Sequence, residues 1–364
     1  MLKKLTALGC VALTVFLLWR MPSLISGYPV NRDGLIRRKS WEGVLRVWIC
    51  QDWSSTLPAW LSRQITAFEK EHKGVHVRVQ KVAPGAWENE ASVPPDILLF
   101  SPGMLSAPQD ILIPFAPSEE FLPETLRSGR WMGEQYALPV ALGGYAVLFN
   151  EGLFPPGVAL IDPQPIKKQQ RYALNVARGG ALAALIGWDE GVRAARTLRM
   201  PEEFGTSTSD QAYAAFVAGN VGALVCSIDH ARKFAAREAA GKGFAYRIET
   251  PLSGFCDQIA MIGRIRRDTN DGRSDMANEF VWFVTGKAAQ DTLANFGLLP
   301  VRTDAAEPSA VTPALAALYN RYKTQLITPN AYGWSAVKDT FFDQSLYALM
   351  SDVGAIHDTI EQIR

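Results

Sequence analysis

Hydrophobic and polar positions alternate in the first hundred residues with the periods of strands and of a helix. Alternation over residues 45–49 and again over 75–79 predicts two strands. Between them, three apolar residues recur at helical spacing before Gly74: Leu61, Ile65 and Phe68. The run from Pro94 to Phe100 is apolar throughout its second half and predicts a third strand, which needs cover on both faces. This order predicts a layered α/β domain with a substantially parallel sheet.

The second half of the chain repeats the mixture of strands and helices. Ser209 or Asp210 can cap a helix that runs through Val217 and that Gly219 ends, and Ser227 or Asp229 can cap another. The remaining predicted elements are strands at 223–226, 244–249 and 259–262, and one long amphipathic helix over 277–296 that Gly297 ends. The sequence itself contains no internal repeat.

One stretch combines a strand with a glycine pair. The apolar run from Tyr145 to Phe149 ends at Asn150 and predicts a buried strand. Gly143 and Gly144 precede it, and without a Cβ they allow another chain or a ligand to approach the backbone.

The first 27 residues form a separate segment. Lys3 and Lys4 precede an apolar run over residues 5–19, which is typical of a signal peptide and short for a membrane span. No A-x-A site follows, so an uncleaved signal anchor is the alternative. Residues 28–43 are polar and predict a linker. We therefore expect a protein on the extracellular or periplasmic face, in contact with the membrane only through this N-terminal segment.

Composition and charge reduce the number of function classes that fit this sequence. The chain has 364 residues, 48% hydrophobic and 20% charged, which suits a globular protein of about two domains. Without residues 1–27, which carry three basic residues, the balance is 34 basic against 36 acidic. No basic patch for nucleic acid appears. Three cysteines follow the leader in apolar surroundings, as small buried hydrophobes, with a Cys226–Cys256 bridge as the alternative: Cys50, Cys226 and Cys256.

The motifs of common enzymes are missing from the sequence. It has no G-x-S-x-G, H-E-x-x-H, Walker or G-x-G-x-x-G pattern. His72 and His76 are four residues apart, but Gly74 breaks the helix that would align them on a metal. We therefore expect no catalytic residue, no metal and no cofactor.

Three ordered segments carry a resemblance to a known family. Tyr136–Pro139 with Tyr145–Phe154 resembles Y-x-x-P…Y-N-K-x-L-F, and residues 215–224 are similar to A-F-x-x-G-x-x-A-M. Residues 277–301 resemble A-x-x-F-x-x-F…Q…G-x-x-P-V. The three patterns that these residues resemble are those of the extracellular solute-binding proteins of ABC importers, in the sugar-type branch that includes maltose-binding protein. The resemblance covers roughly residues 44–364.

The resemblance implies a two-lobed periplasmic-binding-protein-like fold, in which each lobe is a β-sheet flanked by helices and the ligand lies between the lobes. On this chain it places lobe 1 at 44–150 plus 258–300, and lobe 2 at 151–257 plus 301–364. The crossings between lobes would fall near Phe149–Phe154, Gly254–Gln258 and Pro300–Asp304. The implied hinge residues are Asn150, Glu151, Gly254 and Pro300.

Candidate ligand contacts combine aromatic side chains, which suit a sugar face, with polar groups that bind hydroxyls. The candidates are Asp52, Trp53, Ser101, Tyr145, Asp229, His230, Tyr332 and Trp334. For each, the competing interpretation is ordinary packing, capping or an exposed loop.

The sequence thus predicts a non-enzymatic protein that captures a small solute, a carbohydrate in the first instance, and delivers it to the permease subunits of an ABC transporter. The alternatives are an anchored sensing protein of the same fold that feeds a sensor kinase, and a secreted hydrolase.

Overall fold

The protein is described here by a computed structural model. It describes residues 41–51, 53–86, 93–116, 118–153, 174–176, 181, 184, 209–251, 254–267, 272–308 and 313–328. Gly43–Arg364 form one compact unit, separate from Met1–Glu42. The predicted leader and linker lie outside the described residues, apart from the end of the linker. Within the described ranges, no helix combines the length and the apolarity that crossing a membrane requires.

A mixed six-stranded sheet forms the centre of the first lobe, in the order β2-β1-β3-β12-β4, with β7 also paired to β12. Its strands are β1 (Gly43–Cys50), β2 (Val75–Lys81), β3 (Ile97–Phe100), β4 (Leu112–Ile113), β7 (Leu138–Leu142) and β12 (Ile259–Ile265). The pairs of β1 with β2 and with β3 are parallel, as predicted, whereas β12 runs antiparallel to β3, β4 and β7.

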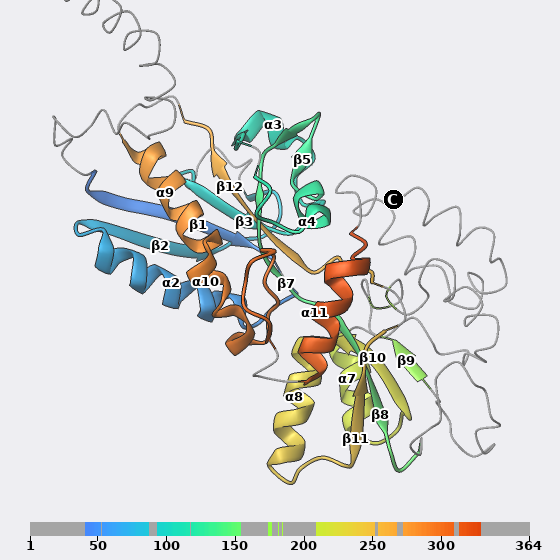
Figure 1. The fold of residues 1–364 in the computed structure, drawn as a ribbon. Coiled ribbons are helices and arrows are strands. Elements are labelled where there is room, and N and C mark those ends of the chain that lie inside the picture. Colours follow the sequence, from blue (N-terminus) through green and yellow to red (C-terminus); the bar gives the residue numbers. More distant parts are fainter. Residues whose placement is uncertain are drawn as a thin grey trace, which may run out of the picture. The chain divides into compact units, whose positions relative to one another are not determined.

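Two helices pack together over this sheet: α2 (Leu57–Glu71) and α9 (Arg273–Thr285) (Figure 1). Their contact is aromatic, with the ring of Phe68 5.0 Å from that of Phe280 and 5.3 Å from that of Phe283. Edge-to-face pairs of this kind add to the burial of apolar area. The helical spacing of Leu61, Ile65 and Phe68 therefore corresponds to a buried face, as predicted.

The predicted long helix over 277–296 is wrong in its second half. Helix α9 ends at Thr285, and Gly286 is extended, with φ −70° and ψ 157°. Two short helices follow: α10 (Lys287–Gln290) and η3 (Leu293–Phe296). Glycine has the largest backbone entropy to lose in a helix, so it is a favourable place for the break. Gly297 ends η3 in the left-handed region, with φ 70°, as predicted.

Shorter elements complete the first lobe between β3 and β7. They are α3 (Pro108–Ile111), α4 (Pro123–Arg127) and the two-stranded hairpin of β5 (Arg130–Trp131) and β6 (Glu134–Gln135).

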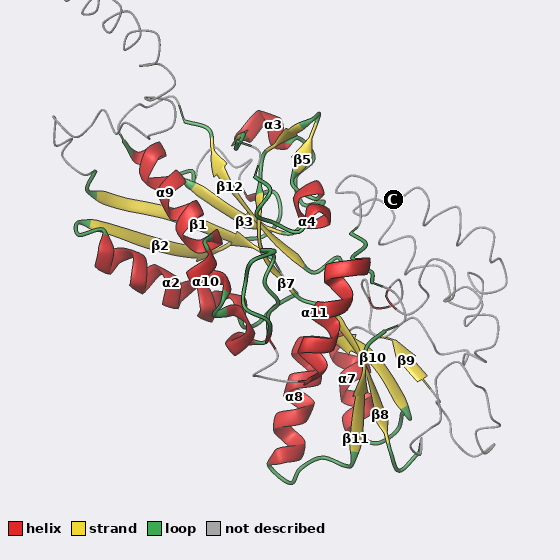
Figure 2. Cartoon of the chain, in the orientation of Figure 1, coloured by secondary structure: helices red, strands yellow, loops and turns green. Residues whose placement is uncertain are grey.

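A second sheet, in the order β11-β8-β10-β9, forms the centre of the second lobe (Figure 2). Its strands and helices are β8 (Tyr145–Asn150), β9 (Leu174–Val176), β10 (Ala223–Ser227), β11 (Tyr246–Glu249), α7 (Ser209–Val217) and α8 (Ile228–Ala239). Phe216 of α7, Phe234 of α8 and Phe244 lie in mutual ring contact, with centroids 4.9 to 5.2 Å apart. The strands predicted at 223–226 and 244–249 correspond to β10 and β11, and Ser227 caps α8 as predicted. Ser209 and Asp210, predicted as caps, are instead the first two residues of α7.

The chain passes between the sheets within two residues. Strand β7 belongs to the first sheet and β8 to the second, and only Gly143 and Gly144 separate them. The predicted place of residues 145–150 in lobe 1 disagrees with this pairing, because β8 bonds only to β10 and β11 among the described strands. The other predicted lobe bounds stay predictions. The chain returns between β11 and β12, and leaves again before α11 (Pro313–Gln325).

Candidate functional site

The candidate site lies where three strands of the first sheet end. Cys50 of β1 is opposite Phe100 of β3, so both strands end at the same edge. Strand β7 runs in the same direction, because both β3 and β7 are antiparallel to β12. The residues that follow these ends include Trp53, Ser101 and Gly143. Such an edge, at the carboxyl ends of strands, is where α/β proteins hold their ligands.

The loop that carries Trp53 is held by its neighbours. The Gln51 amide donates to the Ser54 carbonyl and accepts from the Ser54 N–H, both at 3.0 Å. The Ser54 hydroxyl then accepts from the N–H of Leu57, at 3.1 Å, where α2 begins. Gln51 and Ser54 are both buried. The turn is therefore fixed on both sides of the tryptophan.

Gly143 makes room for Trp53 and for Gln258. A Cβ on Gly143 would lie 2.7 Å from a carbon of the Trp53 ring, closer than real Cβ contacts allow. Gln258, just before β12, accepts the Gly143 N–H through its carbonyl at 2.7 Å and the Gly144 N–H through its side chain at 2.9 Å. Gln258 was not among the predicted ligand contacts, because a single glutamine between Asp257 and Ile259 matches no recognised motif.

Two buried polar atoms at this edge have no hydrogen-bond partner among the described residues. They are the indole nitrogen of Trp53 and the hydroxyl of Ser101. Ser101 is 7% exposed, and the Trp53 ring is half-buried. A buried polar group without a partner costs about 1–3 kcal/mol, and such groups in native proteins call for an explanation. A ligand that reaches this edge would supply the missing partner.

Tyr145 contacts the segment between β11 and β12, where the chain crosses between the sheets a second time. Its hydroxyl donates to a carboxylate oxygen of Asp257 at 2.5 Å. Burial, and next the charge of Asp257, hold the pKa of Tyr145 well above its usual value. The phenol therefore remains a donor at neutral pH, and Asp257, which is half-buried, stays oriented by it.

A second buried tyrosine, Tyr322 of α11, lies beside Gly144. A Cβ on Gly144 would be 3.0 Å from its hydroxyl. Burial, and next the proximity of Cys256, hold the pKa of Tyr322 well above its usual value, and burial raises the pKa of the Cys256 thiol to about 12. The first two crossings and helix α11 thus meet at Tyr145, Cys256 and Tyr322.

The three cysteines after the leader are buried, and none of them forms a disulfide. The interpretation as small buried hydrophobes is confirmed, and the alternative of a Cys226–Cys256 bridge is wrong. Burial raises the pKa of both thiols, which keeps them protonated and unreactive.

Asp229 and His230, adjacent in sequence, face different surroundings. The Asp229 carboxylate accepts from the Ser55 hydroxyl at 2.7 Å, which links α8 to the first lobe. The His230 ring instead stacks on Tyr213 at 4.8 Å and lies 3.2 Å from a carboxylate oxygen of Asp210. Burial lowers the pKa of His230, against the effect of Asp210. Its ring is thus engaged with α7 of its own lobe.

Several solved structures resemble this chain over most of its length. The GacH receptor of Streptomyces glaucescens, solved unliganded and with acarbose, is 17% identical, with a TM-score of 0.61 over 89% of this chain and 96% of that one. A putative oligosaccharide periplasmic-binding protein from Synechococcus sp. MITs9220 is 16% identical, with a TM-score of 0.64 over 88% and 96%. The maltose/maltodextrin-binding domain MalE from Bdellovibrio bacteriovorus, bound to maltotriose, is 16% identical, with a TM-score of 0.60 over 88% and 99%.

The chain has the periplasmic-binding-protein fold. No family model and no curated protein matches the sequence, so the similarity rests on structure. The predicted fold class, with two α/β lobes, is confirmed.

In this periplasmic-binding-protein fold, the first crossing is Gly143–Gly144. We expected it near Phe149–Phe154, but Asn150 and Glu151 lie at the opposite end of β8, where their N–H groups bond to Gly222 and Ala245 of the second lobe. The second crossing was predicted at Gly254–Gln258, which lies between β11 of the second sheet and β12 of the first. Gly254 packs on the backbone at the end of α11. The hinge roles of these residues stay predictions.

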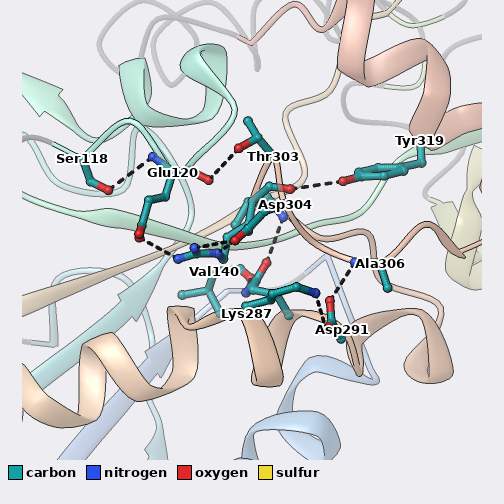
Figure 3. Close-up of polar contacts among 12 residues, drawn as sticks. Ser118, Glu120, Val140, Lys287, Asp291, Thr303, Asp304, Ala306 and Tyr319 are labelled. Carbon is teal, nitrogen blue, oxygen red and sulfur yellow. Dashed lines mark hydrogen bonds and ion pairs between the residues drawn. The ribbon is translucent and has the colours of Figure 1, made fainter.

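The third crossing begins after an anchored segment at Pro300 (Figure 3). The side chain of Gln290 donates to the Val140 carbonyl at 2.7 Å and accepts the Val301 N–H at 2.9 Å. The Arg302 guanidinium pairs with Glu120 at 2.7 Å and in bidentate fashion with Asp304. The Ala306 N–H donates to a carboxylate oxygen of Asp291 at 2.7 Å (Figure 3). The chain is therefore held to the first lobe as far as residue 306, before it reaches α11.

The remaining candidates lie outside the described residues: Asp52, Tyr332 and Trp334. Across the described ranges, no group of three or more histidine, cysteine or acidic side chains could hold a metal ion.

Proposed function

We propose that the protein binds a small neutral solute, a carbohydrate, between its two lobes. The observation that carries the proposal is the pair of partnerless buried groups, the Trp53 indole N–H and the Ser101 hydroxyl, at the carboxyl edge of the first sheet. Sugars offer hydroxyl oxygens to such donors, and the half-buried Trp53 ring offers an apolar face for a pyranose.

The similar structures support this class of ligand, since those compared above were solved with acarbose or maltotriose, or are described as oligosaccharide-binding. We propose that Asp52, Tyr332 and Trp334 complete the site, with Tyr145 behind it. We further propose that the protein works outside the cell membrane and passes its solute to an ABC permease without chemical change.

A thermal-shift panel tests the ligand class. The panel comprises maltose, maltotriose, acarbose, polyols, amino acids and polyamines. A ligand at 100 times its dissociation constant should stabilise the folded protein by about 2.7 kcal/mol. We expect stabilisation by at least one carbohydrate. Stabilisation by polyamines or amino acids alone would replace the ligand class, and release of product from any glycoside would overturn the non-enzymatic role.

A further inference from the structure

Helix α8 belongs to the second lobe, but two of its side chains reach the first. The helix packs on β8 and β10 (Figure 1). The Ser227 hydroxyl caps it by accepting the His230 N–H at 3.3 Å. Asp229 and Arg232 are three residues apart, so they share one face of the helix. They carry opposite charges, and each contacts a different end of a helix in the first lobe.

Asp229 contacts the first lobe just before the start of α2. Its carboxylate accepts from the Ser55 hydroxyl at 2.7 Å and lies 3.5 Å from the Ser55 N–H, which precedes the first turn of α2. Asp229 is also in the first turn of α8 itself. Helix N-termini carry a partial positive charge, so this one carboxylate is favoured by two of them. Lys233, at 3.6 Å, adds a further positive charge.

Arg232 contacts the first lobe at the end of η3. Its guanidinium donates to the carbonyl of Phe296, the last residue of that helix, where the partial charge is negative. Gly297 follows, and a Cβ there would collide with the guanidinium. The glycine that ends η3 therefore also opens the space that Arg232 fills.

We propose that Asp229 and Arg232 form a two-point clasp that holds the lobes together in the absence of solute. The clasp regulates the proposed binding site and in that sense rests on the proposed function. Both contacts must break before the lobes separate. Each is partly solvated, so each should shift the equilibrium between joined and separated lobes by about fivefold. The protein would then select solute from a minority of open molecules.

Distance measurement between spin labels tests the clasp on the full chain without solute. Labels go on Lys73→Cys in the first lobe and Ala239→Cys at the end of α8, both exposed, in a Cys10→Ser background. The other cysteines are buried and do not take up label. We expect one dominant short distance, and an approximately fivefold gain of a longer one in D229A and in R232A.

Matched variants on the same helix separate the clasp from general charge effects. R237A and E238A remove exposed charges from the last turn of α8, and they should leave the distance distribution unchanged. A salt series on the unmutated helix provides a test that does not depend on folding of the variants. Raising the salt to about 1 M, where the Debye length is about 3 Å, should populate the longer distance.

Two results would overturn the clasp: a dominant long distance in the unmutated protein, or D229A and R232A distributions that match the unmutated one. Because no solute is present, these results are independent of the ligand panel. A positive panel with no clasp leaves the binding function in place, and a clasp with a flat panel leaves a property of the fold.

Discussion

At the scale of single residues, a substitution at Ser101 distinguishes a role in solute binding from a role in holding the fold together. Its hydroxyl is buried and lacks a partner among the described residues. Removal of such a group from the free protein abolishes a desolvation cost, so S101A should unfold no more easily, and by up to about 1 kcal/mol less easily. The same change should weaken solute binding about fivefold or more. Chemical denaturation and calorimetry measure both, and lower stability with unchanged affinity would contradict the assignment.

A single methyl group on Gly143 should disturb the first crossing. Its Cβ would lie 2.7 Å from the Trp53 ring and 2.9 Å from the Cβ of Gln258, so G143A overpacks the first crossing. We expect a loss of about 1–3 kcal/mol in the free energy of unfolding, and weaker binding because Trp53 moves. G152A is the control, since a Cβ there meets only the Asn150 side-chain oxygen at 3.2 Å. Equal effects of the two substitutions, measured by denaturation, would refute this view of Gly143.

Some residues of the candidate site could be predicted from the sequence, and others could not. The positions of Trp53 and Ser101 near strand ends were predictable, because both residues follow predicted strands, and their binding role stays a proposal. Gln258 and Arg232 were not, because their roles depend on which distant backbone lies opposite them: the glycine pair in one case, the end of η3 in the other.

At the scale of elements, periodicity and glycine positions located strands β1, β2, β8 and β10 closely. The break at Gly286 was not foreseen, because the apolar spacing continues across it into α10 and η3. The antiparallel course of β12 was not foreseen either, since strand direction follows from the path of the chain between sheets and not from the strand's own residues.

The contact between α2 and α9 contains a titratable pair. His72, at the end of α2, hydrogen-bonds to Glu279 of α9 at 3.0 Å. Burial opposes protonation of His72, but hydrogen bonds to Glu279 and to the Phe68 carbonyl outweigh it and raise its pKa above 6.5. This stabilisation is complete below pH 6.5 and is lost as the pH rises through the raised folded pKa.

The difference between the wild type and E279Q in unfolding free energy isolates this pair. It should be largest in mild acid and shrink as the pH rises. His230 has a lowered pKa and works in the opposite sense, but it is common to both proteins and cancels. A difference that is constant with pH would contradict the role of the pair.

At the scale of the whole molecule, three crossings join the two lobes, and the candidate site lies at the edge of the first sheet beside them. The sequence resemblance predicted two lobes, and the structural likeness at 16–17% identity confirms that fold. The predicted first crossing was misplaced by the length of one strand, because the buried run Tyr145–Phe149 suits the centre of either sheet equally well.

The central claim is that the edge beside Gly143 binds a solute through Trp53. Calorimetric titration of the carbohydrate that stabilises the protein most, into wild type and W53F side by side, tests it most directly. W131F, in the β5–β6 hairpin, is the control. Phenylalanine keeps a ring but removes the indole N–H, so W53F should raise the dissociation constant about fivefold or more while W131F leaves it unchanged. Equal affinity of wild type and W53F would contradict the account.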